Sequence, residues 1–378
     1  MSSFSEQDRC WMARAIRLAA KGRFTTHPNP RVGCLLVRDG QIVGEGFHVR
    51  AGEGHAEVNA LRMAGDQAMG ATAYVTLEPC SHHGKTPPCA EALVQAGVAR
   101  VVSAMVDPNP QVAGRGIKRL LNAGIEASSG LLEAEAKALN PGFIKRMEQG
   151  LPYVRIKTAS SLDGRTAMQS GESQWITGAA ARSDVQRLRA QSSVIVTGVD
   201  SILHDDSSLT VRENELQLDN AAEIVQKQPL RVVLDSQLRM PLNAKILRQS
   251  GRTLIATVSQ DSVKTSALIE SGAEVVLLPA EQNRVSIEAL LEHLVTAEQC
   301  NELLVETGAR LAGAFIAAGV VDELVVYQAM TLMGSDARPM YRLPYSKMDE
   351  QIRLQLLDSR MLGDDLRLTL RPVYTEKN

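Results

Sequence analysis

Cysteine and aromatic residues are scarce in this chain: of 378 residues, 3% are Phe, Trp or Tyr and five are Cys. A small, odd number of cysteines spread along a long chain does not form the disulfide framework of a small secreted domain. We therefore expect Cys10, Cys34 and Cys300 to be small, buried hydrophobic residues.

Long apolar runs and an excess of one charge are lacking as well. No stretch approaches the ~18 apolar residues that a membrane helix requires, and the N-terminus lacks the pattern of a signal peptide. The net charge of −2 indicates no basic surface for nucleic acid, although a local patch can hide in a neutral total. The sequence thus predicts a cytoplasmic protein that binds neither membrane nor nucleic acid.

The chain is long enough to bury two ordinary cores. Helices and strands are predicted to alternate in its first part, which favours a layered α/β domain. The strands predicted there are 32–37, 41–46, 71–77, 100–106 and a short one near residue 125. A Gly and a Pro then interrupt the pattern at 150–152. We therefore predict a first domain at 1–147 and a second at 151–378.

The second domain also alternates between apolar runs and helices. Its predicted strands are 153–157, 193–197, 230–234, 253–257, 273–278, 302–306 and 323–328, separated by helices such as 179–190 and 311–318. Buried apolar runs between helices favour a largely parallel sheet that is covered on both faces. No GxGxxG follows the first strand, so a dinucleotide would not use the usual Rossmann fingerprint.

One constellation in the first domain points to chemistry. His55, Cys80 and Cys89 supply three zinc ligands, and a three-ligand site leaves a fourth position for water or substrate. Zinc lowers the pKa of a bound water to ~7, which makes hydroxide available at neutral pH. Glu57, which is not a ligand, then moves protons. This combination is typical of zinc nucleobase deaminases, so we predict deamination of a cytosine-like or guanine-like ring.

The cysteine spacing departs from the general deaminase signature. That signature separates the two cysteines by two residues, whereas eight residues separate Cys80 from Cys89 here. His82 and His83 could compete as ligands, but a shell of imidazoles would leave both cysteines unexplained. The plainer alternative is that the cysteines are unrelated buried thiols and that His55 is a surface residue.

Several motifs nevertheless resemble a known family. The first domain contains HPNPRVG (27–33), HAEVNAL (55–61) and TLEPCSHHGKTPPC (76–89). The second contains VRIKTASSLDGRTA (154–167), SGESQWITG (170–178), LHDDSSLTVR (203–212) and VETGARLAGAF (305–315). Together they resemble the two halves of bifunctional riboflavin-biosynthesis deaminase-reductases, in the expected order and over nearly the whole chain.

This resemblance implies an N-terminal cytidine-deaminase-like α/β/α layered domain and a C-terminal dihydrofolate-reductase-like α/β domain. It implies Zn²⁺ and NADPH as cofactors and two consecutive reactions. The first deaminates 2,5-diamino-6-ribosylamino-4(3H)-pyrimidinone 5′-phosphate, and the second reduces its ribosyl side chain to ribityl. It also implies a homo-oligomer formed through the reductase domain. The alternatives are a zinc-dependent tRNA or nucleoside deaminase with a non-reductase second domain, and a non-catalytic protein that zinc stabilises.

Residue roles in the second domain rest on the resemblance. The positions that match cofactor contacts are Ala159, Trp175, Asp205, Ser236, Gly308, Ala309, Arg310 and Gly313. The positions that match substrate contacts are Ser173, Arg189, Leu209, Arg212 and Glu306. The planar, charged guanidinium groups of Arg189 and Arg212 suit a sugar phosphate, although a salt-bridged surface role remains open for each. The 306–313 turn can approach a phosphate at a helix N-terminus, or its glycines merely form a tight turn.

Substrate contacts in the first domain are predicted around the metal motif. Asn29 lies between two prolines that stiffen its loop, so its amide is a candidate partner for the ring. The further candidates for the ring, the phosphate or the ribose are His48, His82, Lys85, Thr86 and Asp107. For each of them a turn or surface role remains open.

Overall fold

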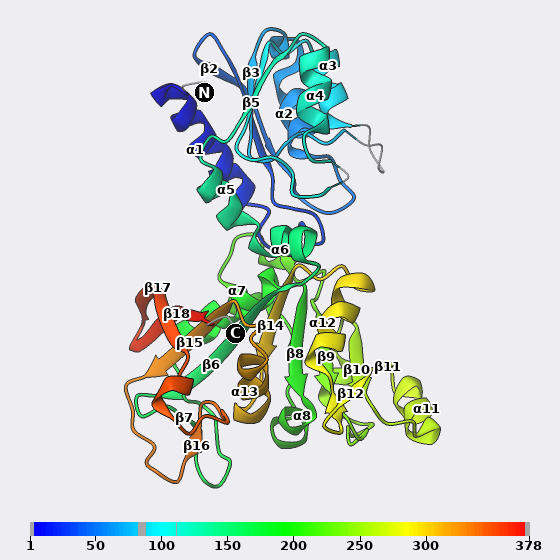
Figure 1. The fold of residues 1–378 in the computed structure, drawn as a ribbon, viewed down its shortest axis with the longest axis vertical. Coiled ribbons are helices and arrows are strands. Elements are labelled where there is room, and N and C mark those ends of the chain that lie inside the picture. Colours follow the sequence, from blue (N-terminus) through cyan, green and yellow to red (C-terminus); the bar gives the residue numbers. More distant parts are fainter. Residues whose placement is uncertain (1–3, 82–87, 111, 375–378) are drawn as a thin grey trace. The chain divides into compact units, whose positions relative to one another are not determined.

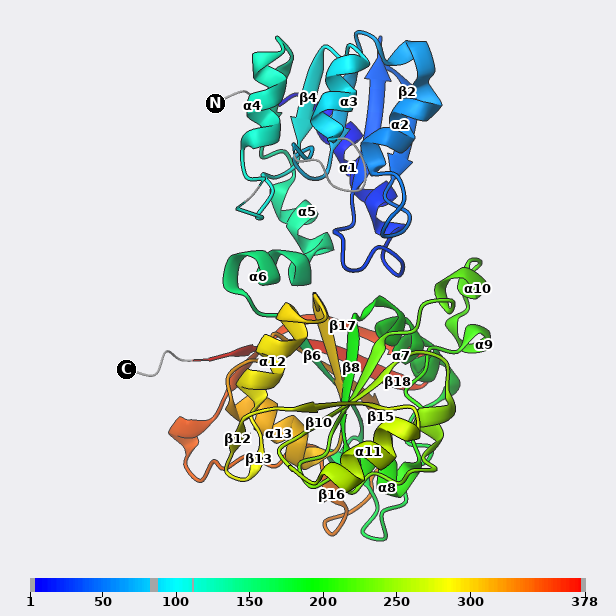
Figure 2. The same cartoon turned by 90° about the vertical axis from the view of Figure 1, so that its right-hand side faces the viewer.

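Two compact units, Met1–Leu151 and Pro152–Asn378, make up the chain in the computed structural model (Figures 1 and 2). The structure describes residues 4–81, 88–110 and 112–374. The candidate substrate residues His82, Lys85 and Thr86 lie outside these ranges. Each unit has its own main sheet, of five strands in unit 1 and nine in unit 2.

Unit 1 contains a mixed sheet with the strand order β2-β1-β3-β4-β5. Strand β1 runs antiparallel to both neighbours, whereas β3, β4 and β5 are parallel. The strands are β1 (Gly33–Arg38), β2 (Gln41–Phe47), β3 (Thr72–Val75), β4 (Arg100–Ser103) and β5 (Glu126–Ser129). The helices are α1 (Glu6–Ala20), α2 (Ala56–Ala64), α3 (Cys89–Gln95), α4 (Arg115–Asn122), α5 (Glu133–Leu139) and α6 (Pro141–Gln149).

Helices cover both faces of this sheet, which makes unit 1 a three-layer domain (Figure 1). On one face, α2, α3 and α4 bury small residues such as Ala60 together with Leu93 and Leu120. On the other, α1 and α5 bury Met12 and Ala136. This arrangement places the first residues of α2 and α3 near the end of β3.

Strand β4 is shorter than predicted. It ends at Ser103 rather than at residue 106. Beyond Ser103 the backbone still bonds to the end of β3 and the segment after it, since the N–H of Ala104 donates to the oxygen of Val75 at 2.9 Å and that of Glu78 to the oxygen of Met105 at 3.0 Å, but the regular strand is not continued. The apolar residues 104–106 continue the hydrophobic pattern without continuing the strand, and hydrophobic pattern alone does not fix element ends.

Unit 2 has the strand order β11-β10-β9-β8-β14-β6-β15-β18-β17. The strands from β11 to β15 are parallel, which confirms the prediction of a largely parallel sheet, and β18 and β17 are antiparallel. These strands are β6 (Tyr153–Ser161), β8 (Val194–Gly198), β9 (Leu230–Leu234), β10 (Thr253–Thr257), β11 (Glu274–Leu277), β14 (Glu302–Glu306), β15 (Glu323–Ala329), β17 (Arg353–Leu362) and β18 (Asp365–Val373). The short pairs are β7 (Arg165–Ala167) with β16 (Arg338–Pro339) and β12 (Ala280–Glu281) with β13 (Arg284–Val285).

Helices lie on both faces of this second sheet as well (Figures 1 and 2). They are α7 (Ala179–Gln191), α8 (Val199–Asp205), α9 (Glu213–Leu216), α10 (Ala221–Ile224), α11 (Ser262–Glu270), α12 (Ile287–Thr296) and α13 (Ala309–Ala317). Side chains of α7, α8 and α11, such as Leu188, Ile202 and Leu268, share one core with the sheet. The opposite face carries α12 and α13.

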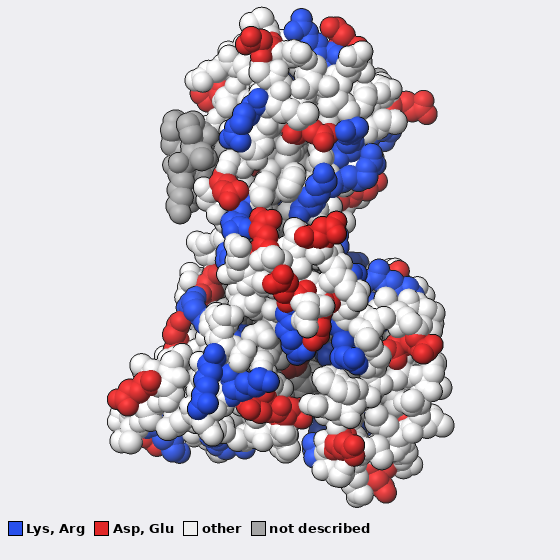
Figure 3. Space-filling model, turned by 180° about the vertical axis from the view of Figure 1, so that it is seen from behind, with Lys and Arg blue, Asp and Glu red and all other residues white. Residues whose placement is uncertain are grey.

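The surface of both units mixes charges of the two signs. On the face drawn in Figure 3, Lys and Arg side chains lie among Asp and Glu side chains in each unit, in keeping with a net charge of −2. Among the residues described, no helix combines the length and apolar character needed to cross a bilayer.

Candidate functional sites

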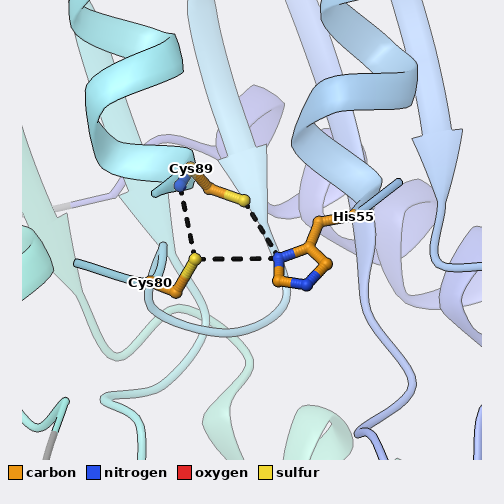
Figure 4. Close-up of side chains that lie close together, drawn as sticks. All are labelled: His55, Cys80 and Cys89. Atoms are coloured by element: carbon orange, nitrogen blue, oxygen red, sulfur yellow. Dashed lines mark hydrogen bonds between the residues drawn. The ribbon is translucent and has the colours of Figure 1, made fainter. Parts of the chain in front are cut away.

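The structure brings together the three residues predicted as metal ligands (Figure 4). His55 is the N-cap residue of α2, Cys89 is the first residue of α3, and Cys80 lies in the loop after β3. His55 Nδ1 lies 3.1 Å from Cys89 Sγ and 3.7 Å from Cys80 Sγ. All three ligand atoms lie within 4.8 Å of one another.

These separations fit one zinc ion. Zinc binds His nitrogen at ~2.0 Å and Cys sulfur at ~2.3 Å, so a tetrahedral site separates the nitrogen from each sulfur by roughly 3.5 Å. The observed 3.1 and 3.7 Å bracket that value. One imidazole and two thiols also form a donor set that zinc prefers.

The electrostatics of the trio favour a charged sulfur. The hydrogen bond from the Cys89 thiol, together with His55, lowers the pKa of Cys80 to about 4 in spite of burial. The same hydrogen bond to Cys80, together with burial, raises the pKa of Cys89. The backbone N–H of Cys89 also donates to Cys80 Sγ at 3.3 Å. Because metal ligands must lose their protons, a preformed thiolate favours metal binding.

Glu57 lies in the first turn of α2, two residues after His55, and its side chain is buried. Burial, reinforced by the negative charge of Cys80, raises the pKa of Glu57 to about 7. A carboxyl group with such a pKa can both accept and donate a proton near neutral pH. This is the property that the sequence prediction required of Glu57.

The position of α2 depends on glycines in the neighbouring strand. A Cβ atom at Gly46 of β2 would lie 2.5 Å from the carbonyl oxygen of Ala56 and 2.6 Å from the nitrogen of Ala60. Only glycine allows so close an approach of helix to strand. The first turn of α2, with His55 and Glu57, is therefore held directly against the sheet.

A buried carboxylate positions the loop that carries Cys80. The side chain of Glu78 accepts hydrogen bonds from the backbone N–H groups of Asp107, Gly114, Gly116 and Ile117. A Cβ atom at Gly116 would lie 1.9 Å from the carbonyl oxygen of Pro79, so the two segments are in direct contact. Sequence reasoning missed Glu78, although a charged residue at the end of a buried strand was a usable signal.

Two predicted substrate residues lie beside the metal ligands. The amide nitrogen of Asn29 lies 3.0 Å from His48 Nε2, and His48 Nδ1 lies 3.2 Å from the carbonyl oxygen of Gly54. Burial lowers the pKa of His48. A neutral ring with its proton on Nδ1 satisfies both contacts, since Nδ1 donates to the carbonyl and Nε2 accepts from the amide. The ring also makes an edge contact with His55, with ring centroids 5.4 Å apart.

Asp107, the third described candidate in unit 1, lines a hollow of about 340 Å³ at the ends of β4 and β5. Its side chain also accepts from the backbone N–H of Asn109 at 2.8 Å. The turn role and the predicted contact role are therefore compatible at this residue.

In unit 2, two predicted substrate residues contact each other. Arg189 of α7 donates from Nε and Nη2 to the two carboxylate oxygens of Glu306, at 2.6 and 2.9 Å. Arg189 Nη1 donates to the carbonyl oxygen of Thr210 at 3.2 Å. Although Glu306 is buried, the positive charges of Arg189 and Lys157 lower its pKa to about 2. Arg189 is therefore ion-paired in the structure, its predicted contact with substrate stays a prediction, and the pair lies at the carboxyl end of β14.

Lys157 is a residue that sequence reasoning missed. Its Nζ lies 3.5 Å from a carboxylate oxygen of Glu306, and the two residues are register partners on the parallel strands β6 and β14. The only signal was a lysine within a predicted strand.

The other predicted substrate positions are scattered over the loops of unit 2. Arg212 pairs with Glu215 on the surface. Leu209 is buried with a positive φ of 51°, which is uncommon for a leucine. Ser173 is half-buried, and the nearby Trp175 is 68% exposed with the guanidinium of Arg182 4.7 Å from its ring centroid.

The predicted cofactor positions follow neighbouring strands at one edge of the sheet. Gly308 is the N-cap of α13 after β14, it is exposed, and a Cβ atom there would meet nothing within 4 Å. No side chain caps this helix start, so its N–H groups suit a phosphate, in agreement with a dinucleotide cofactor. Of the remaining predicted positions, Ser236 follows β9 and Ala309 and Arg310 begin α13, whereas Ala159 lies within β6 and Asp205 is the last residue of α8.

Gly313 has a packing role in the structure. It lies within α13, where a Cβ atom would be 1.9 Å from the backbone oxygen of Arg342. The nitrogen of Arg342 also donates to the oxygen of Ala309 at 3.0 Å. The space beside Gly313 is therefore filled by protein backbone.

Comparison with known proteins identifies both units. Residues 152–368 match the family model described as the RibD C-terminal domain. Residues 5–105 match the cytidine and deoxycytidylate deaminase zinc-binding region. The Riboflavin biosynthesis protein RibD of Escherichia coli (strain K12) is 53% identical over 368 residues, which cover 96% of this chain and 99% of that protein.

Solved structures agree with these matches. Acinetobacter baumannii RibD, form 1, is 49% identical with a TM-score of 0.90, and the match covers 98% of this chain and 99% of that one. A diaminohydroxyphosphoribosylaminopyrimidine deaminase/5-amino-6-(5-phosphoribosylamino)uracil reductase from Thermotoga maritima is 31% identical with a TM-score of 0.84, covering 97% and 99%. The prediction of two α/β domains, an N-terminal deaminase domain followed by a C-terminal reductase domain, is confirmed.

Proposed function

Since this chain belongs to the RibD family of bifunctional riboflavin-biosynthesis enzymes, we propose that its two units act in turn on one pyrimidine ribosyl phosphate. Unit 1 removes the 2-amino group of 2,5-diamino-6-ribosylamino-4(3H)-pyrimidinone 5′-phosphate as ammonia. Unit 2 then reduces the ribosyl side chain to ribityl with NADPH. The observation that carries the proposal is the buried Glu57 beside the three ligands His55, Cys80 and Cys89.

In unit 1, His55, Cys80 and Cys89 would hold a zinc ion, which would supply a Lewis acid that activates water at neutral pH. Glu57, in the first turn of α2 two residues after His55, accepts a proton from the attacking water and returns it to the departing amine. Asn29 and the neutral His48 are hydrogen-bonded to each other, and His48 lies against the ring of His55. Both orient the pyrimidine ring of the substrate. His82 and Lys85 belong to the same proposal as candidate contacts of the ring or the phosphate.

In unit 2, the exposed start of α13 at Gly308 binds a phosphate of the dinucleotide. The carboxylate of Glu306, held by Arg189 and Lys157, accepts hydrogen bonds from hydroxyl groups of the ribosyl chain. Further substrate contacts come from Ser173, Leu209 and Arg212, and further cofactor contacts from Ala159, Trp175, Asp205, Ser236, Ala309 and Arg310.

The substitution Glu57→Gln tests the deaminase assignment. It keeps the shape of the side chain and removes its proton-transfer function, so we expect bound zinc to stay at one equivalent while ammonia release falls by about 10²- to 10⁴-fold. NADPH oxidation with the deaminated intermediate should stay at the wild-type rate. Glu53→Gln, at a nearby exposed position, is the matched control and should change neither rate. Normal ammonia release by the Glu57 variant would contradict the proposal.

We further propose that the protein is cytoplasmic and forms a homo-oligomer through unit 2. The described cysteines are free thiols, as a reducing compartment favours. Cys34 and Cys300 are buried as predicted, whereas the prediction was wrong for Cys10, which is exposed. Strand β17 is the edge of the large sheet, and nearly all of its ten residues are exposed. They include Leu354, Leu356 and Met361, which are 47%, 56% and 56% exposed. An exposed apolar edge strand is a template for pairing with another chain, and here a second copy is the partner.

The substitution Leu356→Lys tests this interface. A charge on the exposed edge opposes strand pairing, so we expect sedimentation velocity to show a lower mass for the variant than for the wild type. The exposed Val263→Lys on α11 lies away from this edge and should leave the mass unchanged. A wild-type protein that sediments as a monomer at micromolar concentration would refute the oligomer and leave both activities untouched.

A further inference from the structure

Four neighbouring strands define the path of the cofactor in unit 2. Strands β14, β8, β9 and β10 are adjacent in this order and parallel, so their carboxyl ends meet at one edge of the sheet. Gly308 follows β14 and Ser236 follows β9. A dinucleotide with one phosphate at Gly308 and a contact at Ser236 therefore crosses the end of β8, where α8 begins (Figure 1).

The loop after β9 is closed around a buried carboxylate. Asp235 is fully buried, and one of its carboxylate oxygens accepts a hydrogen bond from the backbone N–H of Met240. The contact from Met240 is 2.7 Å long. On the outer side of this loop, the hydroxyl of Ser236 accepts from the N–H of Val285 at 3.2 Å. These two bonds close the loop that carries Arg239.

The side chain of Arg239 is also held in place. Its Nη2 donates to Oδ1 of Asp200 in the first turn of α8, at 2.7 Å. The side chain is nevertheless 45% exposed. The permanently charged guanidinium of Arg239 therefore lies between the ends of β8 and β9, where a ligand that crosses the end of β8 can reach it.

We infer that Arg239 binds the 2′-phosphate of NADPH and thereby sets the preference for NADPH over NADH. In dinucleotide sites, an arginine near the adenosine ribose accommodates the 2′-phosphate. The guanidinium carries five N–H donors in a planar fork that matches phosphate oxygens, and the contact with Asp200 engages one nitrogen. Asp200 positions the fork. The inference rests on the proposed reductase function of unit 2.

The test measures binding of NADPH, NADH and adenosine 2′-monophosphate to the full-length protein by isothermal titration calorimetry. For Arg239→Ala we expect NADPH and adenosine 2′-monophosphate to bind about ten- to a hundredfold more weakly, because charge-assisted hydrogen bonds are lost. NADH should bind as before. Arg239→Lys keeps a point charge and should lose only part of the NADPH affinity. Arg248→Ala removes an exposed charge from the same β9–β10 connection, beyond the loop, and should change no affinity.

The possible outcomes separate the inference from its premise. If the wild-type protein binds neither NADPH nor NADH, the proposed reductase function fails. If it binds NADPH in preference to NADH and Arg239→Ala keeps that preference, the reductase function stands and the role of Arg239 is refuted. Equal losses for NADPH and NADH in Arg239→Ala would also refute the role, since they would indicate a general disturbance of the loop.

Discussion

Asp8 shows how a single residue away from the metal ligands can stabilise unit 1. Its carboxylate completes a capping box with Ser5 at the start of α1. It also accepts from the hydroxyl of Tyr74 at 2.6 Å and from Arg100 at 2.8 Å. Although burial alone would raise the pKa of Asp8, these hydrogen bonds lower it well below its usual range. Asp8 thereby joins the first helix to two strands of the sheet.

We predict that Asp8→Asn lowers the free energy of unfolding of unit 1 by about 2 kcal/mol at neutral pH, the value of hydrogen bonds to a charged group. A depressed folded-state pKa contributes stability above the unfolded-state pKa of ~3.9 and loses it as the pH falls through the folded-state pKa. The difference between wild type and variant should therefore be constant from roughly pH 5 to 7 and shrink below about pH 4.

Denaturant unfolding at several pH values measures this difference. Asp39→Asn is the control, because the side chain of Asp39 is 91% exposed and lies 3.6 Å from Arg38 in a solvated pair. It should cost little at any pH. A difference between wild type and Asp8→Asn that grows on acidification would show that the assigned direction of the pKa shift is wrong.

Residues close in sequence were easier to assign than residues brought together by the fold. His55, Cys80 and Cys89 stand in short motifs whose residue types already indicate zinc. The ion pair of Arg189 and Glu306 joins residues 117 positions apart, so no local sequence pattern could predict it. The four backbone hydrogen bonds to Glu78 were equally hidden, because they depend on the path of a loop rather than on side-chain types.

At the scale of elements, the contact of α2 with β2 determines where His55 and Glu57 lie. We predict that Gly46→Ala lowers the free energy of unfolding of unit 1 by about 1–3 kcal/mol, because the added methyl group overlaps the helix backbone. Zinc affinity should fall by about ten- to a hundredfold, as it does when a ligand loses its support. Competition with a chelator of known affinity measures the second effect.

Gly40→Ala is the control for Gly46→Ala, because it adds backbone strain without displacing α2. Gly40 lies in the turn before β2 with a φ of 73°, and a Cβ atom there would meet nothing within 4 Å. The substitution should cost roughly 1 kcal/mol through backbone strain and leave zinc affinity as it was. If Gly46→Ala also leaves zinc affinity unchanged, the helix contact does not position the ligand.

Elements buried on the sheet were predicted better than those at its margin. The apolar runs of β8, β9, β10 and β14 stand out because these strands are covered on both faces. The hairpin of β17 and β18 was missed. Nearly every side chain of β17 is exposed, so burial imposes no alternation on its sequence. Its strand conformation comes from pairing with β18.

At the scale of the whole molecule, each unit has its own core and its own proposed reaction. We predict that removing zinc with a chelator abolishes ammonia release and leaves NADPH oxidation with the deaminated intermediate intact. In scanning calorimetry, only the transition of unit 1 should move to lower temperature, because a ligand stabilises the unit that binds it. Loss of both activities, or a shift of both transitions, would show that the units do not act independently.

The four hydrogen bonds to the carboxylate of Glu78 affect the entropy cost of metal binding in unit 1. Since four backbone N–H groups fix that carboxylate two residues before Cys80, much of the conformational entropy at this ligand is lost during folding rather than during metal capture. The chain then presents Cys80 in a preorganised position. We therefore expect zinc binding at Cys80 to require little further ordering of the chain before this residue.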